Sequence, residues 1–482
     1  MNIVKEGGDK LQEKCAVVGV STKDSGSESA QIAYQALFAL QHRGVEGSGI
    51  VSTDGRALRV HRKPGMVRDV FEASDLERLS GRIAIGHNRY STSGGRHAHL
   101  QPVISPSIGF AMAHNGNLPD TEALTAYLAK RRYITEQYND SELFARALGS
   151  KLHGGRDFLA ALQEVSELAV GAYACVATYD GSLYGFRDPH GVRPLEIGKF
   201  EGGYMLASET CALDTVGAEH VRSVKPGELV VIRDGKLVST QQFAKSTEHF
   251  DAFELVYFAR LDSIMCGRRV ETVRRDFGRE LAALHTPEWI SPKTTVVSAV
   301  PDTSIPAAEA YAAALKLPYV SAIVKNRYIG RTFMQPTQAS RKNSLRLKHT
   351  MLPELVAGKD LVIIDDSIVR GNTLPRLVEL AKSVGAKTVT VLIASPPIRF
   401  PDFYGVDTPE QVDLMAANMT IEQMRQATGA DYLGFLPVSG LVRATGIPRE
   451  KLNLAAFTGE YPVSIGQRAK HITPPVSMEC VD

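Results

Sequence analysis

Two adjacent carboxylates at the end of an apolar run are the clearest chemical signal in this sequence. Residues 361–364 are aliphatic (LVII), and Asp365 and Asp366 follow them directly. Since ligands of open α/β sheets bind beyond the carboxyl ends of the strands, these carboxylates should face a ligand. Their oxygens can accept hydrogen bonds from ribose hydroxyls and can hold Mg²⁺. The pattern therefore predicts a site for a sugar and a metal ion after this strand.

The residues that follow have the composition of an anion-binding loop. Residues 367–373 (SIVRGNT) are mostly small or polar and lead into a helix expected over about 372–384. Backbone N–H groups and a helix N-terminus together favour a bound monophosphate. The alternative is a strand that ends in two surface aspartates and a turn. The candidate ligands of the loop are Ser367, Arg370, Gly371, Asn372 and Thr373.

The string DDSIVRGNT resembles the motif with which type I phosphoribosyltransferases bind phosphoribosyl pyrophosphate (PRPP). The resemblance implies that Asp365 and Asp366 contact the ribose and Mg²⁺. It also implies that residues 300–304 (VPDTS) form a pyrophosphate and metal loop, with Ser304 beside Mg²⁺. Without the resemblance, this segment is a strand-to-helix turn with Ser or Thr as its cap.

A cationic segment lies between these two motifs. Residues 325–333 (KNRYIGRTF) carry Lys325 and Arg331, and Gly330 can act as a hinge. Cations stabilise the negative charge of departing pyrophosphate, and a hinged segment can close over a substrate and exclude water. In a chain with a PRPP motif we expect that role for Lys325 and Arg331. In isolation the segment would be a solvated basic loop.

The N-terminal part of the chain carries a second possible site. Cys15 opens an apolar run, where a lone cysteine is most often a small buried residue. Three strings follow it in order, QHRG at 41–44, GHNRYST at 86–92 and HNGNL at 114–118. Together with CAVVG at 15–19 they resemble class II glutamine amidotransferases, whose nucleophile is an N-terminal cysteine.

That resemblance implies a nucleophilic mechanism for Cys15. Its thiol would attack the amide carbon of glutamine and form a thioester. A free α-amino group, with a pKa near ~7.7–8.0, can serve as the base on the same residue. Cys15 would then be the first residue of the mature protein, and residues 1–14 would be a propeptide that is removed.

The resemblance also assigns the groups that bind glutamine. The Asn115 side chain and the Gly116 N–H would stabilise the oxyanion of the tetrahedral intermediate. Arg89 would pair with the carboxylate of glutamine and Asp140 with its ammonium group. Outside the ordered set of strings, Asn115-Gly116 would be a common turn and Arg89 a surface ion-pair residue.

Both halves in this order resemble the glutamine PRPP amidotransferases over roughly 15–465. Further strings of that family are DPHGVRPL at 188–195, ASETC at 207–211 and YFAR at 257–260. The resemblance implies that glutamine releases ammonia, which travels through an enclosed channel to Mg-PRPP and displaces pyrophosphate to give 5-phosphoribosylamine. This is the entry reaction of purine synthesis. It further implies feedback inhibition by purine nucleotides and assembly as a homodimer or homotetramer.

The order of the predicted strands and helices indicates two domains and two flanking segments. Short strands broken by Gly and Pro turns fill the first part, with helices near 120–132 and 140–169, which indicates layered α+β packing. From about residue 270, aliphatic strands alternate with helices, the first near 305–315, which indicates a buried, mainly parallel sheet. We expect a propeptide at 1–14, an N-terminal-nucleophile glutaminase domain of αββα layers at 15–250, an α/β type I phosphoribosyltransferase domain at 251–465 and a C-terminal tail at 466–482, loose from Ile472.

The composition is typical of a globular protein and predicts neither a membrane span nor a disulfide framework. The 482 residues have a net charge of +2, with 44% hydrophobic and 22% charged residues, which is ordinary for a globular protein. The net charge predicts no nucleic-acid partner, and no apolar run of about 20 residues predicts a membrane span. The five cysteines are an odd number and form no CxxC pair, so a disulfide framework or structural zinc site is not expected. We expect a cytoplasmic enzyme.

The sequence departs from the family pattern at several positions. Val45 stands where Gln is expected, and Leu261 where Pro is expected, which puts details of the glutamine pocket rim and of the domain junction in doubt. Some members with a propeptide hold an iron–sulfur cluster on four cysteines. We predict no cluster here, because the aligned positions are Asp251, Asp402, Asn453 and Ala456.

Two alternatives remain at this stage. A non-catalytic PRPP-sensing regulator would not need the cysteine half or the cationic segment, and it would usually add a basic DNA-reading module. An enzyme of the glucosamine-6-phosphate synthase type would share the glutaminase half but would lack the DDSIVRG string.

Overall fold

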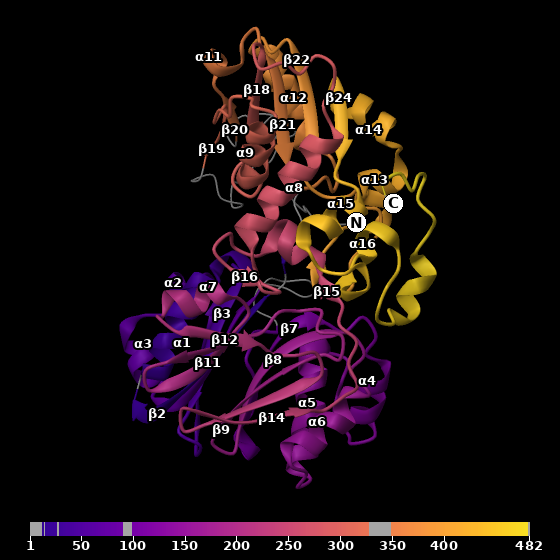
Figure 1. Ribbon diagram of the computed structural model, residues 1–482. Helices are drawn as coiled ribbons and strands as arrows, with labels where there is room; N and C mark the ends of the chain where they lie inside the picture. The colour runs from indigo at the N-terminus through magenta and orange to yellow at the C-terminus, as the bar shows by residue number, and fades with distance from the viewer. Residues whose placement is uncertain (1–11, 14, 27, 90–98, 327–348, 481–482) are drawn as a thin grey trace, which may run out of the picture.

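The computed structural model describes residues 12–13, 15–26, 28–89, 99–326 and 349–480. The chain forms two halves, one above the other in Figure 1, with α8 (Val270–Leu284) at the junction. The lower half contains the segments from β2 (Ala16–Gly26) to β14 (Lys236–Gln242), whereas β1 (Gln12–Glu13) pairs with β23 (Val406–Asp407) of the upper half. The upper half contains the segments from β15 (Phe250–Asp251) onward, because residues 250–259 share a core with α8 and with helices that follow it.

The lower half is a sandwich of two antiparallel sheets between helices. In the described residues, one sheet has seven strands in the order β12-β10-β11-β2-β5-β3-β4, and the other has six in the order β14-β13-β9-β8-β7-β6. Helices α1 (Glu28–Ala39) and α7 (Thr210–Thr215) pack on the first sheet, and α5 (Asp140–His153) and α6 (Phe158–Ser166) pack on the second. These are the αββα layers expected from the sequence.

The strands of the sandwich are between three and eleven residues long. The first sheet contains β2 (Ala16–Gly26), β3 (Gly47–Thr53), β4 (Leu58–Pro64), β5 (Gly81–Arg89), β10 (Glu196–Phe200), β11 (Gly203–Ala207) and β12 (Glu219–Ser223). The second contains β6 (Val103–Ser105), β7 (Phe110–Asn117), β8 (Ala172–Tyr179), β9 (Ser182–Arg187), β13 (Glu228–Arg233) and β14.

The apolar run after Cys15 is continuous because both faces of β2 are buried. Val18 and Val20 join the core under α1, whereas Val17 joins the core between the two sheets. Successive side chains of a strand point to opposite faces, so a strand between two cores needs apolar residues at every position.

The upper half is built on a parallel sheet in the order β18-β21-β22-β24. Its strands are β18 (Thr295–Ala299), β21 (Asp360–Asp365), β22 (Thr388–Ile393) and β24 (Tyr432–Phe435). Val362 and Ile364 pack with α8, α9 (Ile305–Ala314) and α15 (Val438–Thr445) on one face. Leu361 and Ile363 pack with α12 (Leu374–Ser383) and α14 (Ile421–Thr428) on the other. The expectation of a buried, mainly parallel sheet is confirmed.

Local expectations needed correction in two places. The helical stretch expected over 140–169 is two helices, since Gly154 and Gly155 end α5 and the Asp157 carboxylate caps α6 by accepting the Ala160 N–H at 2.9 Å. The short helices α2 (Val67–Val70), α3 (Ala73–Arg78) and α7 were not expected. Each spans only a few residues, too short for a helical period to stand out in a sequence.

The expectation of a loose C-terminal end is wrong for the described residues. Residues Gly466–His471 form a 3₁₀ helix, and the Val476 N–H donates to the Ala417 carbonyl at 3.0 Å. The Val438 N–H donates to the Cys480 carbonyl at 3.1 Å. The tail is held because its backbone groups find partners on the upper half.

The crossing between the halves is an extended segment. After β14 the chain reaches β15 (Phe250–Asp251), which pairs in parallel with β25 (Leu452–Asn453). A strand next to the expected boundary therefore pairs with a strand near the end of the second expected domain. The boundary at 250/251 stays a prediction.

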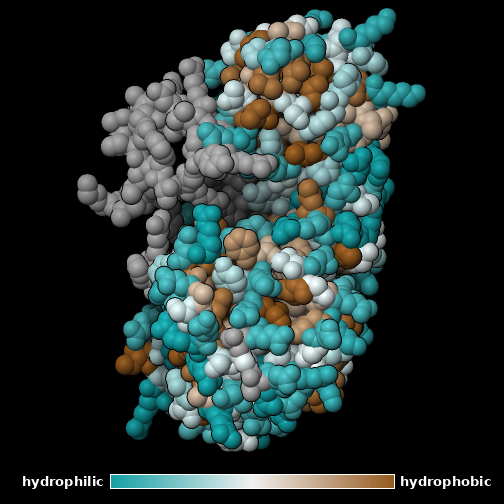
Figure 2. All heavy atoms as spheres, turned by 90° about the vertical axis from the view of Figure 1, so that its left-hand side faces the viewer, coloured by the Kyte–Doolittle hydropathy of each residue, from teal (hydrophilic) through white to brown (hydrophobic). Residues whose placement is uncertain are grey.

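The surface offers no sign of a membrane-spanning element in the residues described. No helix there is long and apolar enough to cross a bilayer. On the face drawn in Figure 2, hydrophilic residues predominate, and apolar residues form small separate groups in both halves.

Close packing of α8 on α9 should make Gly278 intolerant of a side chain. A Cβ atom at Gly278 would lie 2.0 Å from the Ala307 carbonyl oxygen of α9. We expect Gly278→Ala to cost roughly 1–3 kcal/mol and to lower the thermal unfolding temperature by roughly 2–10 °C.

The matched control is Gly149→Ala in α5, where the nearest atom to a new Cβ is the Ser105 Oγ at 3.3 Å. Its effect should stay within about 1 kcal/mol in either direction. Equal unfolding temperatures for the two variants, measured by circular dichroism, would contradict the packing argument.

Candidate functional site

Cys15 lies at the beginning of β2, where the two sheets of the sandwich meet the upper half. Its side chain is buried, and its N–H donates to the Arg43 carbonyl at 3.3 Å. Its φ of +131° is unusual for a residue with a side chain. The next residue, Ala16, pairs with Asn88, so Cys15 lies at the end of β5 that carries Arg89.

Asn115 and Gly116 lie near the end of β7 in the facing sheet. Asn115 is fully buried, and neither its Oδ1 nor its Nδ2 has a hydrogen-bond partner among the residues described. Such groups are rare in native structures and call for an explanation, and a ligand is one. Gly116 has a φ of +146°, and a Cβ there would lie 2.0 Å from the Ala172 carbonyl oxygen, so only glycine fits.

Asp140 is the first residue of α5, beside the loop that follows β7. The Leu118 N–H donates to its Oδ2 at 3.1 Å, and Asn139 caps the helix by accepting the Glu142 N–H at 2.9 Å. Arg89 is the last residue of β5 and is 5% exposed. Five residues expected for glutamine chemistry thus lie at element ends around the junction of the halves.

Two histidines of this region are neutral near neutral pH. Burial lowers the pKa of His87 to about 3, and the neighbouring His114 adds to the effect. Burial also lowers the pKa of His114, although Asp140 opposes it. A histidine that stays neutral does not supply the positive charge that stabilises a thiolate. The geometry therefore leaves the activation of Cys15 to another group.

A fully buried charge cluster joins the two halves behind Cys15. Arg43 donates through Nε to Glu209, and its Nη2 lies 2.6 Å from Glu254 Oε2. Arg193 lies 3.0 Å from Glu254 Oε1 and 2.8 Å from Asp251 Oδ2. We call these five residues the junction cluster. It connects β-sandwich segments to the start of the upper half.

Sequence reasoning gave the junction cluster no role, although three of its members lie in family strings that it recognised. Burial opposes the charge of Glu209, yet Arg43 and His42 hold its pKa well below the usual value. Burial, helped by Asp402, raises the pKa of Asp251 to about 8. The available signal was the presence of Arg43, Arg193 and Glu209 in these strings, which does not say that the three side chains are buried or which partners they have.

The positions compared with iron–sulfur ligands are gathered at this junction. Asp251 pairs with Asn453 across β15 and β25, and Asp402 influences the pKa of Asp251. Asn453 Oδ1 accepts the Ala455 N–H at 3.2 Å, and the Ala456 carbonyl accepts the Arg399 N–H at 2.9 Å.

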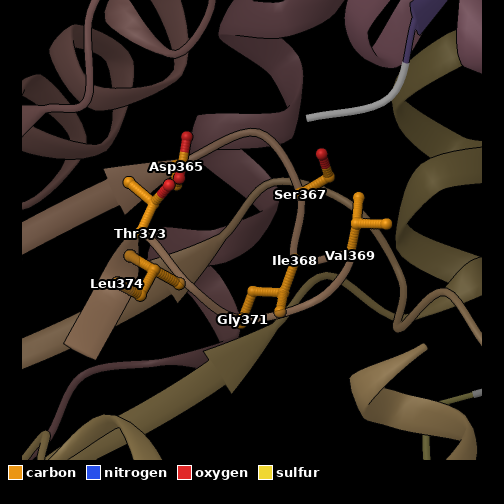
Figure 3. Close-up of a pocket in the computed structure, with 7 residues that line it drawn as sticks. All are labelled: Asp365, Ser367, Ile368, Val369, Gly371, Thr373 and Leu374. Atoms are coloured by element: carbon orange, nitrogen blue, oxygen red, sulfur yellow. The ribbon is translucent and has the colours of Figure 1, made fainter. Parts of the chain in front are cut away.

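The acidic pair of the upper half lies at the carboxyl end of β21, as expected. A pocket there is lined by one continuous loop, with Asp365 and Thr373 together at its two ends and Ser367 on the opposite limb (Figure 3). The lining residues are Asp365, Ser367, Ile368, Val369, Gly371, Thr373 and Leu374.

The loop residues contact one another through oxygen atoms. Ser304 Oγ lies 3.4 Å from Asp365 Oδ1, the Asp366 N–H donates to Asp365 Oδ1 at 2.9 Å, and Ser367 Oγ donates to Asp366 Oδ1 at 2.7 Å. All four side chains are buried. Buried carboxylates with a hydroxyl neighbour form an oxygen donor set that fits a hard divalent cation.

The part of the loop around Gly371 leaves no room for a side chain. Gly371 has a φ of +74°, and a Cβ there would lie 2.3 Å from the Met415 sulfur. Thr373 directly precedes α12, so the loop faces the positive end of this helix. Asn372 is exposed, and Arg370 lies 3.5 Å from Asp413.

The cationic segment is described only in part. Lys325 ends β19 (Ile323–Lys325), and its Nζ lies 3.4 Å from Asp302 Oδ2 in the 300–304 loop. The structure thus brings one expected cation to the loop that precedes α9. Arg331 lies outside the described residues.

Each half of the chain contains a region that matches a known protein family. A family model for a glutamine amidotransferase domain matches residues 87–215, and one for a phosphoribosyl transferase domain matches residues 278–402. Among curated proteins, the amidophosphoribosyltransferase of Bacillus subtilis is 40% identical over 465 residues, 95% of this chain and 96% of that protein. The one from Synechococcus elongatus is 39% identical over 469 residues, 96% of this chain and 94% of that protein.

Solved structures agree. The glutamine PRPP amidotransferase of B. subtilis, solved as a complex with ADP and GMP, superimposes with a TM-score of 0.86 at 38% identity, covering 94% of this chain and 98% of that one. A structure described as the allosteric regulatory enzyme of purine biosynthesis gives a TM-score of 0.87 at 38% identity, covering 94% of this chain and 97% of that one.

Burial of His87 predicts a pH dependence of stability. Unfolded histidine takes up a proton below about pH 6.5, whereas folded His87 stays neutral down to a pH of about 3. Neutral, buried His87 therefore contributes fully to the free energy of unfolding above about pH 6.5. This contribution is lost as the pH falls, by up to about 1.4 kcal/mol per pH unit for one such group. We expect His87→Leu to flatten the decline of the unfolding temperature between about pH 6.5 and 5.

The comparison variant is His471→Leu, which removes an exposed histidine of the tail and should keep the original slope. Identical slopes for His87→Leu and the unmodified chain would count against a neutral buried His87.

Proposed function

The chain belongs to the amidophosphoribosyltransferase family, and we propose that it transfers the amide nitrogen of glutamine to PRPP, giving 5-phosphoribosylamine, glutamate and pyrophosphate. The observation that carries this proposal is the buried Asn115 amide, which has no partner among the described residues. Its neighbour His114 lies close to His87, whose strand pairs with β2 directly after Cys15. An acceptor site in the other half of the chain completes the pair of reactions.

In the glutaminase half, Cys15 is the proposed nucleophile. The thiol gives its proton to the α-amino group and its sulfur bonds to the amide carbon. The resulting oxyanion accepts hydrogen bonds from Asn115 Nδ2 and the Gly116 N–H. Collapse breaks the C–N bond, the ammonium returns the proton to the leaving nitrogen, and water then hydrolyses the thioester to glutamate. This scheme needs an α-amino group on Cys15, which supports removal of residues 1–14 as a propeptide.

Arg89 and Asp140 are the proposed anchors of the amino acid. A guanidinium binds a carboxylate through two parallel hydrogen bonds, and a carboxylate pairs with an ammonium group. Their positions support this role, because β5 ends beside the strand that follows Cys15 and α5 begins beside the end of the strand that carries Asn115.

In the upper half, the loop after β21 is the proposed PRPP site. Ser367, Gly371 and Thr373, with Arg370 and Asn372 nearby, bind the 5′-phosphate at the start of α12. Asp365 and Asp366 bind the ribose hydroxyls, and together with Ser304 they would hold Mg²⁺. Bound Mg²⁺ neutralises the charge that develops on pyrophosphate.

Lys325 and Arg331 are the proposed partners of the pyrophosphate. Lys325 already lies at the 300–304 loop through its contact with Asp302. Positive charge there favours departure of the leaving group. Ammonia released in the lower half would be protonated if it reached bulk water, so we propose an enclosed passage between the two sites.

Regulation and assembly follow the family. The B. subtilis relative was solved with ADP and GMP bound, which supports purine nucleotides as feedback inhibitors of this chain. We further propose a homodimer or homotetramer and a cytoplasmic enzyme. A PRPP-sensing regulator does not explain the match of the whole chain to curated enzymes.

Substitution of Cys15 should separate the two half-reactions. Cys15→Ala in the processed chain should abolish phosphoribosylamine formation from glutamine, since no thioester can form, but keep formation from added ammonia within about twofold. Pyrophosphate release with each nitrogen source measures both. Loss of the ammonia-dependent reaction in a folded variant would contradict the division of labour between the halves.

Loss of Asp366 or of Mg²⁺ should impair the reaction with ammonia and spare glutamine hydrolysis, which is the opposite of the effect of Cys15→Ala. Asp366→Asn, or chelation of divalent cations, should lower the reaction with ammonia by about 10²-fold or more. Glutamine hydrolysis measured without PRPP should change little, because the lower half holds its own site. Full ammonia-dependent activity under chelation would rule out the metal assignment.

A further inference from the structure

Gln101 is a buried polar residue to which the mechanism above gives no part. It precedes β6, is 5% exposed, and its backbone passes so close to β3 that a Cβ on Gly49 would lie 2.2 Å from its carbonyl oxygen. The backbone is therefore fixed against the first sheet, while the side chain reaches the second.

The Gln101 carboxamide contacts both backbone groups of His114. Its Oε1 accepts the His114 N–H at 2.7 Å, and its Nε2 lies 3.4 Å from the His114 carbonyl oxygen. A side-chain amide carries an acceptor and a donor, so it can bind a peptide unit as a neighbouring strand would.

The contact between Gln101 and His114 lies just beyond the last residue pair of β6 and β7. β6 pairs with β7 only from Ser105, opposite Phe110, to Val103, opposite Met112. His114 has the same orientation as Phe110 and Met112 because alternate residues of a strand point their backbone groups to the same side. In the described residues no further β6 pair covers it, and the Gln101 side chain takes that place.

The same amide reaches the helix that carries Asp140. Gln101 Nε2 lies 3.3 Å from Ser141 Oγ, which lies 2.8 Å from His114 Nδ1. Ser141 and His114 are both buried. Gln101, His114 and Ser141 therefore tie the end of β7 to the first turn of α5.

We propose that Gln101 is a positioning residue for glutamine hydrolysis, which holds the Asn115 oxyanion donor in register with Asp140. This inference rests on the proposed function. Asn115 directly follows the clamped residue, and its amide lacks partners of its own in the described structure, so its orientation depends on the backbone of His114. Small displacements of an oxyanion donor reduce its effect on the transition state.

The test compares Gln101→Glu and Gln101→Met in the processed, full-length enzyme. An ionised Glu cannot donate to the His114 carbonyl, and Met has similar length but neither group. We expect kcat for glutamine hydrolysis to fall about 10–100-fold with KM changed less than about threefold. Pyrophosphate release driven by ammonia should stay within about twofold of the unmodified enzyme, which reports on folding.

A matched control is Gln411→Glu in the upper half. Gln411 is also buried, and its side chain likewise accepts the Thr473 N–H at 3.0 Å and donates to the Thr473 carbonyl at 2.8 Å. It should lower stability without reducing kcat for glutamine hydrolysis. A decline in kcat equal to that of Gln101→Glu would show a general stability effect and overturn the proposal.

The pH profile adds a signature that a structural role would not produce. In the Gln101→Glu variant, the protonated carboxyl group can donate to the His114 carbonyl, and its burial beside that oxygen favours the neutral acid. The ratio of Gln101→Glu to unmodified kcat should therefore rise as the pH is lowered, whereas that of Gln101→Met should stay constant.

Each remaining outcome decides against the proposal. Unchanged kcat in both Gln101 variants, or an effect on KM alone, overturns it. Loss of both the glutamine and the ammonia reactions in both variants assigns Gln101 to folding and overturns it as well. If the unmodified processed enzyme hydrolyses no glutamine while using ammonia, the proposed glutaminase function itself has failed, and the positioning role fails with it.

Discussion

The junction cluster is the constraint on which the rest of the structure depends. Arg43, Glu209, Arg193, Asp251 and Glu254 are ionisable groups buried away from solvent, and removing one partner of such a group leaves the other without compensation, which is strongly destabilising. Their partners come from both halves, so the charges are balanced only when the halves are docked. Because the Arg43 carbonyl also accepts the Cys15 N–H, the same docking fixes the beginning of β2.

From this cluster a series of interactions leads to the loop after β21. Glu254 begins a wide helical turn, Glu254–Phe258, whose Leu255 carbonyl accepts the Arg274 Nε–H at 2.9 Å. Arg274 lies on α8, where burial lowers its pKa to about 10 against the opposing influence of Asp366. The junction cluster and the loop after β21 are thus linked through the Glu254–Phe258 turn and Arg274 of α8.

How far the sequence predicted this molecule depended on whether the signal was local. The loop after β21 is one contiguous string, and the pocket lined by its residues lies where the string predicts. The alternation of Val17 and Val18 between two cores follows from the apolar run alone. By contrast, Arg43 and Glu254 are 211 residues apart, and no spacing rule joins them. Gln101 was missed for a similar reason, since its meaning lies in the premature end of β6, which only the strand register reveals.

The positive φ of Cys15 bears on the proposed removal of residues 1–14. A left-handed backbone at a residue with a side chain costs of order 1–3 kcal/mol. That torsion is defined by the peptide bond that joins Cys15 to the preceding residue, so it would exist only while that bond is intact. If the leader is removed as proposed, the torsion disappears with the bond, and the released energy opposes rejoining. Strain of that size would shift the equilibrium between the joined and the cut chain by roughly 5- to 150-fold toward the cut chain.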